Sequence, residues 1–237
     1  EHNVDFKPGD VVDIDTAKHP FTITTSKDTQ FQADAIIIAT GSTPRRLGCP
    51  GEDKYWGKGV TTCAVCDGSL FKGKPVVIVG GGDSAMEDAA FMLNFTDDIT
   101  IVQIEDEITA SEATKEGVVD NPNIDIIYNS TVTKIIGEGD TVTGVEVTNQ
   151  KTDETQTLDA NAVFVAIGLS PNTEFLEGKI ELTDYGHIIH KEYTQTSQKG
   201  IFAAGDVADP RYMQAITSSG MGCRAALDAE KFIKRNT

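Results

Sequence analysis

The sequence predicts an α/β fold with two Rossmann-like domains, one continuous and the other split around it. Three observations lead to this prediction. Strands and a helix alternate from Lys74 onward, and a glycine-rich turn at 80–82 joins a strand to that helix. Two buried strands also end alike, in Ala-Thr-Gly at 39–41 and Ala-Ile-Gly at 166–168. We therefore expect two parallel sheets whose carboxyl ends carry glycine turns.

The first part of the chain reads as short strands. Apolar and β-branched residues predict strands at 11–15 and 21–25, and a buried strand runs from Ala33 to Gly41. The polar segment 42–50 contains two prolines and is predicted to link the domains.

The middle part predicts a βαβ core with an excursion of strands. Residues 84–94 read as a helix because apolar side chains recur at helical spacing. We expect strands 124–127, 132–135 and 143–147 to form one antiparallel meander. The parallel strands of the core are predicted at 75–79, 99–103 and 162–166.

The last part begins with a second predicted linker at 169–172. We expect strands around Ile188 and at 201–204, and an amphipathic helix over 215–233.

Composition excludes several classes of function. The formal net charge of −17 argues against a nucleic-acid partner, because phosphate contacts require clustered Lys and Arg. No stretch approaches the roughly 20 apolar residues of a membrane span, so no membrane partner is predicted. Four cysteines are too few for a disulfide scaffold and favour a reducing compartment, with the cytoplasm as the default.

The strongest chemical signal is the segment Cys-Ala-Val-Cys-Asp-Gly at 63–68. Cys63 and Cys66 can close a small disulfide ring, and Asp67 can exchange a proton with a leaving thiolate. The alternative is a pair of zinc ligands, but zinc needs four ligands and no second pair follows nearby. The spacing favours redox chemistry over zinc and leaves both open.

The second signal is the segment Gly-Gly-Gly-Asp-Ser-Ala at 80–85, with a predicted strand before it and a helix after it. Glycines at 80 and 82 let a pyrophosphate approach the backbone, and the helix start at Asp83 and Ser84 offers free N–H groups. The alternative is an ordinary glycine turn between a strand and a helix.

The end of the next strand should select the nicotinamide nucleotide. Glu105 lies about twenty residues beyond the glycines, where a carboxylate binds a ribose 2′-hydroxyl and repels a 2′-phosphate. No Arg or Lys occurs between Lys74 and Lys115, so we expect NADH rather than NADPH. A solvated acidic turn is the alternative.

The third signal is the buried strand that ends in Gly205 and Asp206. This places a carboxylate where it can bind a polyol hydroxyl. The last helix opens at Gln214 and Ala215, and its start can face a flavin or a phosphate. Cys223 lies among small helical residues and is predicted to be a buried, inert thiol.

Taken together, these motifs resemble the low-molecular-weight thioredoxin reductases of the pyridine nucleotide-disulfide oxidoreductase family. The similarity covers the whole chain and includes the segments Ala-Ile-Gly-Leu-Ser-Pro-Asn-Thr at 166–173 and Gly-Ile-Phe-Ala-Ala-Gly-Asp-Val at 200–207. Alkyl-hydroperoxide-reductase flavoproteins share most of this core and stay open as an alternative.

The resemblance implies two domains of the three-layer ββα type, usually in a homodimer. Residues 1–43 and 171–237 would form an FAD-binding domain, and residues 44–170 an NAD(P)-binding domain that carries the CxxC centre. The cofactor-binding residues implied for FAD and the nicotinamide are Thr40, Gly41, Gly80, Gly82, Asp83, Ser84, Glu105, Gly168, Gly205, Asp206, Gln214 and Ala215.

The resemblance also implies an order of events. Electrons would pass from a nicotinamide through FAD to the Cys63–Cys66 disulfide, and then to a thioredoxin-like protein. By this analogy Cys66 lies against the flavin, Cys63 attacks the partner disulfide, and Asp67 transfers the proton.

Three departures from the family pattern change these expectations. The N-terminal βαβ unit that would carry the FAD pyrophosphate is missing, so we expect a fragment or an internal start. The His-Arg-Arg-x-x-x-Arg signature for NADPH is replaced by residues 103–109, which contain no arginine. Met213 stands where an arginine often precedes Gln-Ala. Two alternatives follow, a reductase of the same fold fed by ferredoxin or a deazaflavin, and a truncated, non-catalytic nucleotide-binding module.

Overall fold

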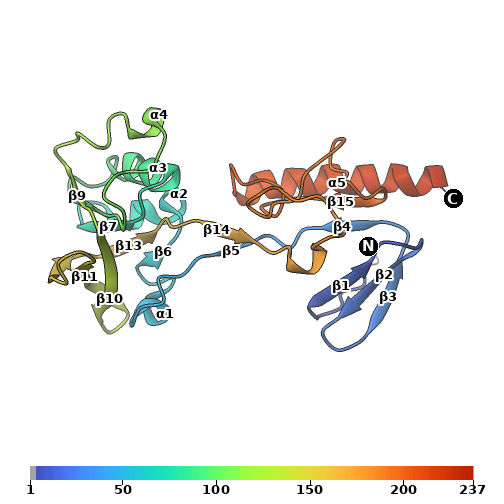
Figure 1. The fold of residues 1–237 in the computed structure, drawn as a ribbon, viewed down its shortest axis with the longest axis horizontal. Coiled ribbons are helices and arrows are strands. Elements are labelled where there is room, and N and C mark those ends of the chain that lie inside the picture. The colour runs from blue at the N-terminus through green and yellow to red at the C-terminus, as the bar shows by residue number, and fades with distance from the viewer. Residues whose placement is uncertain (1–3, 237) are drawn as a thin grey trace. The chain divides into compact units, whose positions relative to one another are not determined.

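The computed structural model describes residues 4–236 and divides the chain into two compact units (Figure 1). Unit 1 comprises Glu1–Thr43 and Ser170–Thr237, and unit 2 comprises Pro44–Leu169. The predicted second boundary, between 170 and 171, differs from this division by one residue. The outer ends of the predicted ranges, residues 1–3 and 237, lie outside the described residues. Which cofactor each unit binds stays a prediction at this point.

Unit 2 is built on a five-stranded sheet whose neighbouring strands all run parallel, and this confirms the predicted α/β class. Continuous apolar runs such as Val76–Val79 form strands buried on both faces. In sheet order, the strands are β6 (Val60–Thr61), β13 (Ala162–Val165), β7 (Val76–Val79), β8 (Ile99–Val102) and β9 (Ile124–Ile127).

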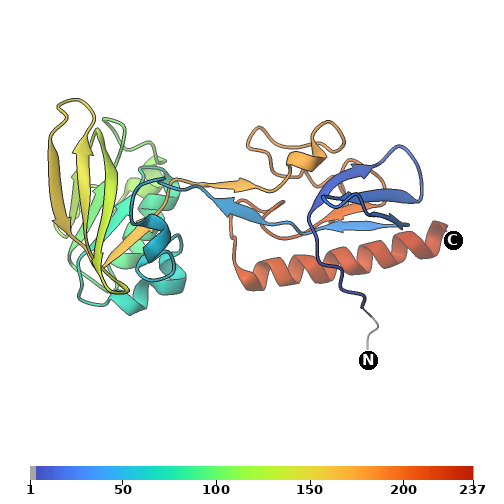
Figure 2. The ribbon, with the colours of Figure 1, turned by 90° about the horizontal axis from the view of Figure 1, so that it is seen from below.

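Two further layers cover this sheet, so unit 2 has the predicted ββα architecture. Side chains on one face, such as Ile78 and Phe164, pack with helix α3 (Asp83–Met92). Those on the other face, such as Val77 and Val163, pack with an antiparallel meander, which Figures 1 and 2 show on the side opposite α3. The meander comprises β10 (Ser130–Glu138), β11 (Thr141–Asn149) and β12 (Thr155–Asp159). The remaining elements are α1 (Glu52–Tyr55), α2 (Ala64–Asp67), the 3₁₀ turn η1 (Gly68–Phe71) and α4 (Glu112–Lys115).

The prediction that residues 124–127 join the meander was wrong. These residues form β9, which pairs in parallel with β8 at the edge of the main sheet. The meander instead takes its third strand from 155–159, where polar and apolar side chains alternate too weakly to mark a strand.

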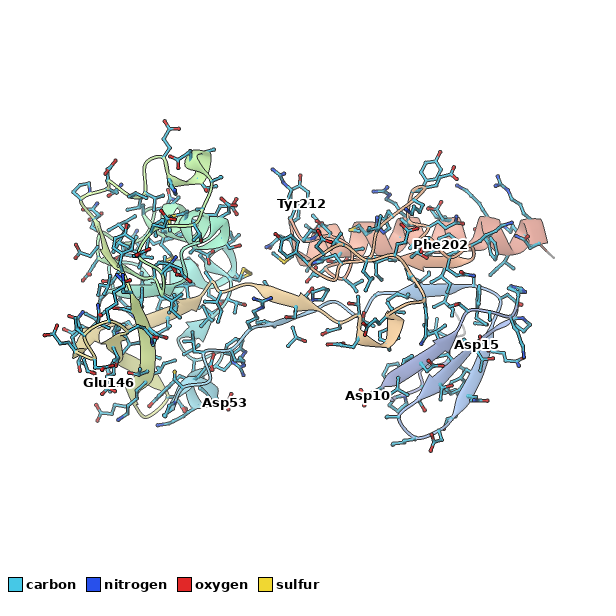
Figure 3. All side chains as sticks on the ribbon, in the orientation of Figure 1. Asp10, Asp15, Asp53, Glu146, Phe202 and Tyr212 are labelled. Carbon is cyan, nitrogen blue, oxygen red and sulfur yellow. A yellow bond between two sulfur atoms is a disulfide. The ribbon has the colours of Figure 1, made fainter. Side chains whose placement is uncertain are left out.

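Unit 1 repeats the same layering on a smaller scale. Its parallel pair, β4 (Ile36–Ile38) and β15 (Ile201–Ala203), lies between a three-stranded meander and helix α5 (Ala215–Asn236). Phe202 of β15, which Figure 3 labels, packs edge-on against Phe232 of the helix. The meander and one 3₁₀ turn complete the unit: β1 (Val11–Asp15), β2 (Phe21–Thr25), β3 (Gln30–Ala33) and η2 (Glu174–Leu176).

The sequence misplaced two strands in unit 1. Around Ile188 the described backbone makes a single bridge with Leu182 and no strand, so that prediction was wrong. The strand β3 was not predicted, because its exposed residues carry no buried apolar pattern.

Both predicted linkers contain a short strand. β5 (Ser42–Pro44) and β14 (Leu169–Pro171) pair with each other where the chain passes between the units. Within residues 4–236, no helix combines the length and the apolar character needed to cross a membrane.

Candidate active site

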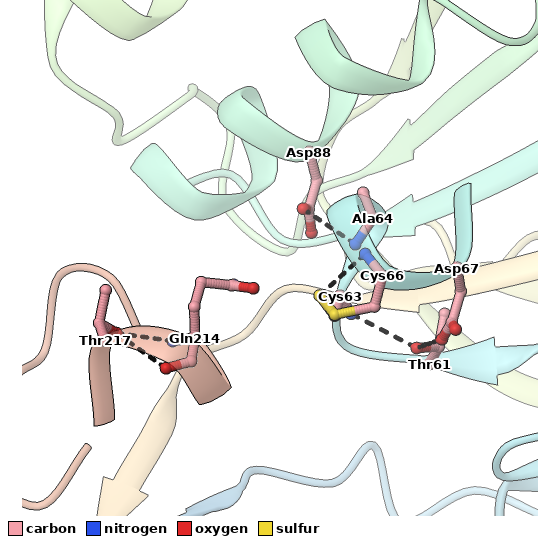
Figure 4. The surroundings of a disulfide bond; sticks show 8 residues. All are labelled: Thr61, Cys63, Ala64, Cys66, Asp67, Asp88, Gln214 and Thr217. Atoms are coloured by element: carbon pink, nitrogen blue, oxygen red, sulfur yellow. Dashed lines mark hydrogen bonds between the residues drawn. A yellow bond between two sulfur atoms is a disulfide. The ribbon is translucent and has the colours of Figure 1, made fainter. Parts of the chain in front are cut away.

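The dithiol lies immediately after the short strand β6, at the start of α2 (Figure 4). Cys63 and Cys66 form a disulfide with an S–S distance of 2.08 Å and a Cα–Cα distance of 5.3 Å. Cys63 is the N-cap of α2, and the Cys66 backbone N–H donates to the Cys63 Sγ at 3.1 Å. No cluster of metal-ligating side chains occurs among the described residues. The bonded pair fits a redox-active centre rather than a zinc site.

Asp67 is held by a threonine on the strand that precedes the dithiol. The Thr61 hydroxyl donates to Asp67 Oδ2 at 2.5 Å, and Thr61 Oγ1 in turn accepts the Cys63 backbone N–H at 3.4 Å. Both residues line a cavity of about 360 Å³ in unit 2, together with Leu70 and Phe71. Thr61 therefore ties the carboxylate and the backbone of Cys63 to one point.

A second carboxyl group, which the sequence analysis missed, faces the start of α2 from helix α3. Asp88 accepts the Ala64 backbone N–H through Oδ1 at 3.4 Å (Figure 4). Burial raises the pKa of Asp88 to about 6, the hydrogen bond from Ala64 opposes this rise, and the neighbouring Glu87 carboxylate adds to it. A Glu-Asp pair in a helix resembles a solvated face, so sequence alone gave no signal.

A cleft of about 720 Å³ opens at the carboxyl ends of the parallel strands of unit 2. Residues that follow β7, β8 and β13 line it, and β13 and β8 lie on opposite sides of β7. In open parallel sheets, this reversal of strand order is where nucleotides bind. Of the predicted residues, the cleft brings together Gly80, Gly82, Asp83, Ser84, Glu105 and Gly168.

The three glycines of the turn have different roles. Gly80 has a φ of +131°, and a Cβ there would lie 2.4 Å from the Ala166 carbonyl oxygen. A Cβ on Gly81 would lie 2.3 Å from the Gln103 amide nitrogen. Gly82 meets nothing within 4 Å, so its missing side chain leaves open space over the start of α3. Gly80 and Gly81 serve packing, whereas Gly82 keeps a cradle of the kind that fits a pyrophosphate.

The Asp83 carboxylate is hydrogen-bonded within the protein and is therefore not free for a ligand alone. The Thr114 hydroxyl and the Ser111 backbone N–H donate to Asp83 Oδ1 at 2.5 and 2.8 Å. These hydrogen bonds, that of Thr114 first, lower the pKa of the exposed Asp83 carboxyl. Asp83 thus fixes the loop that precedes α4 against the start of α3.

The loop after β8 is shaped by a buried glutamine. Gln103 donates its side-chain amide to the Glu107 carbonyl at 2.9 Å and accepts the Ile104 backbone N–H at 3.1 Å. The turn so formed exposes Glu105 at the rim of the cleft. Asp106, in the same loop, pairs with Lys151 at 3.2 Å.

Two arginines from the predicted linker also line this cleft, and the sequence analysis missed them. Arg46 lies over the Trp56 ring, 3.3 Å from its centroid, and pairs with Asp53 at 3.1 Å. Arg45 forms no ion pair among the described residues. Both lie far from the glycine turn in sequence, so only the fold brings them to the cleft.

The predicted cofactor residues of unit 1 gather at the carboxyl ends of β4 and β15. Thr40 and Gly41 follow β4, and Gly205 and Asp206 follow β15, its parallel partner. Asp206 Oδ1 accepts the Ser218 hydroxyl at 2.9 Å. Gly41 and Gly205 have φ angles of +68° and +81°, which favour glycine.

Gln214 and Ala215 open the 22-residue helix α5 beside this edge of the sheet. The Gln214 carbonyl accepts the Thr217 hydroxyl at 2.8 Å and the Ser218 N–H at 3.0 Å, which fixes the first turn. A partly exposed carboxylate, two glycine turns and a helix start suit a polyol and its hydroxyl groups. The residues present therefore fit the polyol part of a flavin nucleotide.

The remaining cysteines are both free. Burial and the nearby Glu52 carboxylate raise the pKa of the Cys49 thiol. The prediction of a buried Cys223 was wrong, because this thiol is exposed on α5. Small neighbours in a helix do not say which face is covered.

Comparisons with known proteins match most of the chain. The pyridine nucleotide-disulphide oxidoreductase family matches residues 1–222. The thioredoxin reductase of Streptomyces clavuligerus is 44% identical over 227 residues, which are 95% of this chain and 70% of that protein. The thioredoxin reductase of Dictyostelium discoideum is 43% identical over 225 residues, 93% of this chain and 70% of that protein.

Solved structures agree with these sequence matches. A thioredoxin reductase from Giardia duodenalis aligns with a TM-score of 0.89 at 43% identity, covering 95% of this chain and 74% of that one. A thioredoxin reductase from Streptococcus pyogenes MGAS5005 aligns with a TM-score of 0.88 at 33% identity, covering 96% and 74%.

Proposed function

Because the chain belongs to the thioredoxin reductase group of the pyridine nucleotide-disulphide oxidoreductase family, as its motifs predicted, we propose that it reduces the disulfide of a thioredoxin-like protein. Membership makes it an oxidoreductase with a flavin and a nicotinamide as cofactors. The observation that carries the proposal is the Cys63–Cys66 disulfide, formed in the same unit as the dinucleotide cleft.

We assign the attack on the partner disulfide to Cys63. After reduction, a Cys63 thiolate keeps the hydrogen bond from the Cys66 N–H, which favours its charged form. The Cys63 sulfur attacks one sulfur of the partner and releases the other as a thiolate. Cys66 then attacks the mixed disulfide, which restores the Cys63–Cys66 bond and leaves the partner reduced.

Asp67 is the proposed proton carrier for this exchange. It directly follows Cys66 in the chain, and the Thr61 hydroxyl holds its carboxylate in one position. Bound FAD would supply the two-electron chemistry that links a nicotinamide to the disulfide. The residues that would hold its polyol are Thr40, Gly41, Gly205, Asp206, Gln214 and Ala215.

Exposed apolar side chains beside the dithiol favour a protein partner over a small disulfide. Val65, between the two cysteines, is 60% exposed, and Leu70 on η1 is 68% exposed. Exposed apolar groups next to a reactive pair are typical of protein-docking surfaces.

Trapping of the mixed disulfide tests the assignment of the cysteines. In a background in which Cys49 and Cys223 are serine, we expect Cys66→Ser to displace thionitrobenzoate from a thioredoxin that lacks its resolving cysteine and carries this leaving group on the remaining one. The product is a stable one-to-one adduct, measured by mass spectrometry. Cys63→Ser is the matched control and should form none. If both variants are trapped equally, or neither is, then the assigned roles are wrong.

For the electron donor, we propose NADH over NADPH. Glu105 at the rim of the cleft would accept a ribose hydroxyl and repel a 2′-phosphate. Arg46 is occupied by Trp56 and Asp53, whereas Arg45 is left to balance the pyrophosphate charge.

Kinetics of the flavin-loaded enzyme test this choice of donor. We expect kcat/KM for NADH to exceed that for NADPH, and Glu105→Ser to reduce the preference by about tenfold. Glu107→Ser, a loop change outside the cleft, is the control and should leave it unchanged. Failure of NADH to bleach the flavin in stopped-flow mixing would favour a ferredoxin or deazaflavin donor instead.

We also propose a homodimer in the cytoplasm, as the resemblance implies. The chain has two free cysteines in addition to its single dithiol, which is consistent with a reducing compartment. Light scattering of the purified protein tests the dimer, and subcellular fractionation tests the compartment.

A further inference from the structure

Asp88 joins the dithiol to a helix of the nucleotide-binding unit. It lies in the second turn of α3, the helix whose first turn borders the dinucleotide cleft. Its carboxyl group accepts the N–H of Ala64, the residue between Cys63 and the rest of α2 (Figure 4). The carboxyl group therefore faces the turn in which the Cys63 sulfur changes its charge.

The charged groups around Asp88 are few. The elements α2, α4, β7 and β8 contact α3, and η1 and β13 share its hydrophobic cluster. α2 contributes the disulfide and Asp67, which is held by Thr61, and α4 contributes Glu112 and Lys115, which pair with each other at 3.0 Å. η1, β7, β8 and β13 contribute no ionisable side chain. On α3 itself, Glu87 adjoins Asp88 in sequence and its charge raises the pKa of Asp88, while Asp83 is hydrogen-bonded to Ser111 and Thr114.

We propose that Asp88 takes up a proton when the Cys63–Cys66 disulfide is reduced, so that the dithiol and this carboxyl group titrate together. The inference rests on the proposed redox function of the dithiol. Two electrons break the S–S bond, one proton goes to the Cys66 sulfur, and the Cys63 sulfur remains a thiolate. A second proton, from water, converts the Asp88 carboxylate to the acid, so the net charge of the centre is unchanged.

The physical reason is repulsion between like charges. A new thiolate in the turn that Asp88 faces raises the pKa of its carboxyl group, because a like charge nearby disfavours the ionised form. With the disulfide intact this pKa is about 6, so Asp88 is mostly ionised at neutral pH. At pH 7, a rise of about one unit leaves Asp88 half protonated, and a rise of about two units leaves it mostly protonated. The same coupling in reverse makes the Cys63 thiolate easier to form when Asp88 is protonated.

Infrared difference spectroscopy tests the proton uptake directly. The full chain is reduced chemically with a phosphine at pH 7, without flavin or partner. We expect a carboxylic acid C=O band to appear on reduction, to be lost in Asp88→Asn, and to persist in Asp67→Asn. No band in the native protein, or a band that persists in Asp88→Asn, would overturn the proposal.

Redox titration against glutathione between about pH 6 and 8 gives a second measure. We expect the native protein to bind two protons per disulfide reduced near neutral pH, and Asp88→Asn to bind one. Glu87→Gln removes the adjacent exposed carboxylate as a matched control and should keep two. If the disulfide does not cycle at all, the proposed function fails. If it cycles with the same proton count in Asp88→Asn, only this inference fails. The infrared band of the native protein decides the matter should Asp88→Asn not fold.

Discussion

Two carboxyl groups, those of Asp67 and Asp88, lie near one dithiol and differ in their hydrogen bonds and burial. Asp67 accepts a hydroxyl hydrogen bond from Thr61, whereas Asp88 accepts one long hydrogen bond from a backbone N–H and is partly buried. A carboxylate with a good hydrogen bond is stable when charged, and one that is buried with a weak partner is not. At the residue scale, we therefore propose that Asp67 transfers protons and that Asp88 compensates the charge of the thiolate.

The first prediction concerns stability, because burial raises the pKa of Asp88 to about 6 from its ordinary value of 3.8. The folded state thus binds the proton more tightly than the unfolded state. The stability that the folded protein gains by binding this proton on Asp88 is fully present below pH 3.8 and is lost as the pH rises through about 6. We expect Asp88→Asn to increase the free energy of unfolding by about 1–2 kcal/mol at neutral pH, after a discount for partial solvent exposure.

Urea unfolding of the oxidised protein at about pH 4 and pH 7 measures this. The gain of Asp88→Asn should be small at the lower pH and appear at the higher one. Glu87→Gln, on the exposed face of α3, is the control. An equal effect of Asp88→Asn at both pH values would contradict the assignment.

The second prediction concerns Thr61 as a positioning residue for Asp67. Thr61→Val keeps the shape of the side chain and removes the hydroxyl that holds the carboxylate. We expect reduction of the Cys63–Cys66 disulfide by dithiothreitol to slow several-fold and its pH profile to move. Thr61→Ser restores the hydroxyl and should restore both, whereas a purely structural role would leave the pH profile in place.

At the scale of elements, the turn from β7 to α3 contains one glycine that we expect to serve stability and another that we expect to serve ligand binding. The third prediction compares two glycines in this turn. Gly80→Ala places a Cβ against the Ala166 carbonyl at a positive φ, and we expect it to destabilise unit 2 by about 2 kcal/mol or more. Gly82→Ala meets nothing in the protein, so stability should hold while affinity for NADH falls.

Thermal unfolding and fluorescence titration with NADH separate the two effects. The two variants differ only in the position of one methyl group, so each is the control of the other. If Gly82→Ala binds NADH normally, the turn is an ordinary strand–helix connection and not a phosphate cradle.

Also at this scale, the sequence predicted which residues form strands better than it predicted which strands pair with one another. Apolar runs marked β7, β8 and β13 because strands buried on both faces need continuous apolar side chains. The run at 124–127 was equally visible, but nothing local distinguishes a parallel edge strand from the start of a meander. Its partner, β8, is set by packing across the whole sheet.

The residues of the site also fall into two groups, those that the sequence predicted and those that only the fold brings there. Cys63, Cys66 and Asp67 are adjacent in sequence, and the glycines of the cleft follow a recognisable strand. Asp88, Arg45 and Gln103 reach the dithiol or the cleft only through the fold. Residues that act across elements carry no local pattern, so the sequence predicted the reactive groups and missed those that surround them.

At the scale of the whole molecule, each unit has its own interior. The two hydrophobic clusters around β7 and β13 contain only residues of unit 2, and the two around β4 and β15 contain only residues of unit 1. The formal charge of −17 is carried largely at the surface, as with Asp10 and Asp15 at the two ends of β1 (Figure 3). Self-repulsion of this kind weakens a compact state, so the separate interiors must each stabilise their unit.

The fourth prediction follows from this division. Unit 2 is one continuous stretch, Pro44–Leu169. It contains the parallel sheet with a layer on each face, the dithiol and the cleft at the carboxyl ends of the strands. Its length is that of an ordinary autonomous domain. We expect residues 44–169 produced alone to unfold cooperatively, to form the Cys63–Cys66 disulfide, and to bind NADH within about twofold of the affinity of the full chain. Circular dichroism, thiol titration and fluorescence measure these properties, with Gly82→Ala in the same segment as the binding control. A segment that stays unfolded while the full chain folds would mean that unit 2 depends on unit 1 for its stability, and the two would then be one cooperative domain.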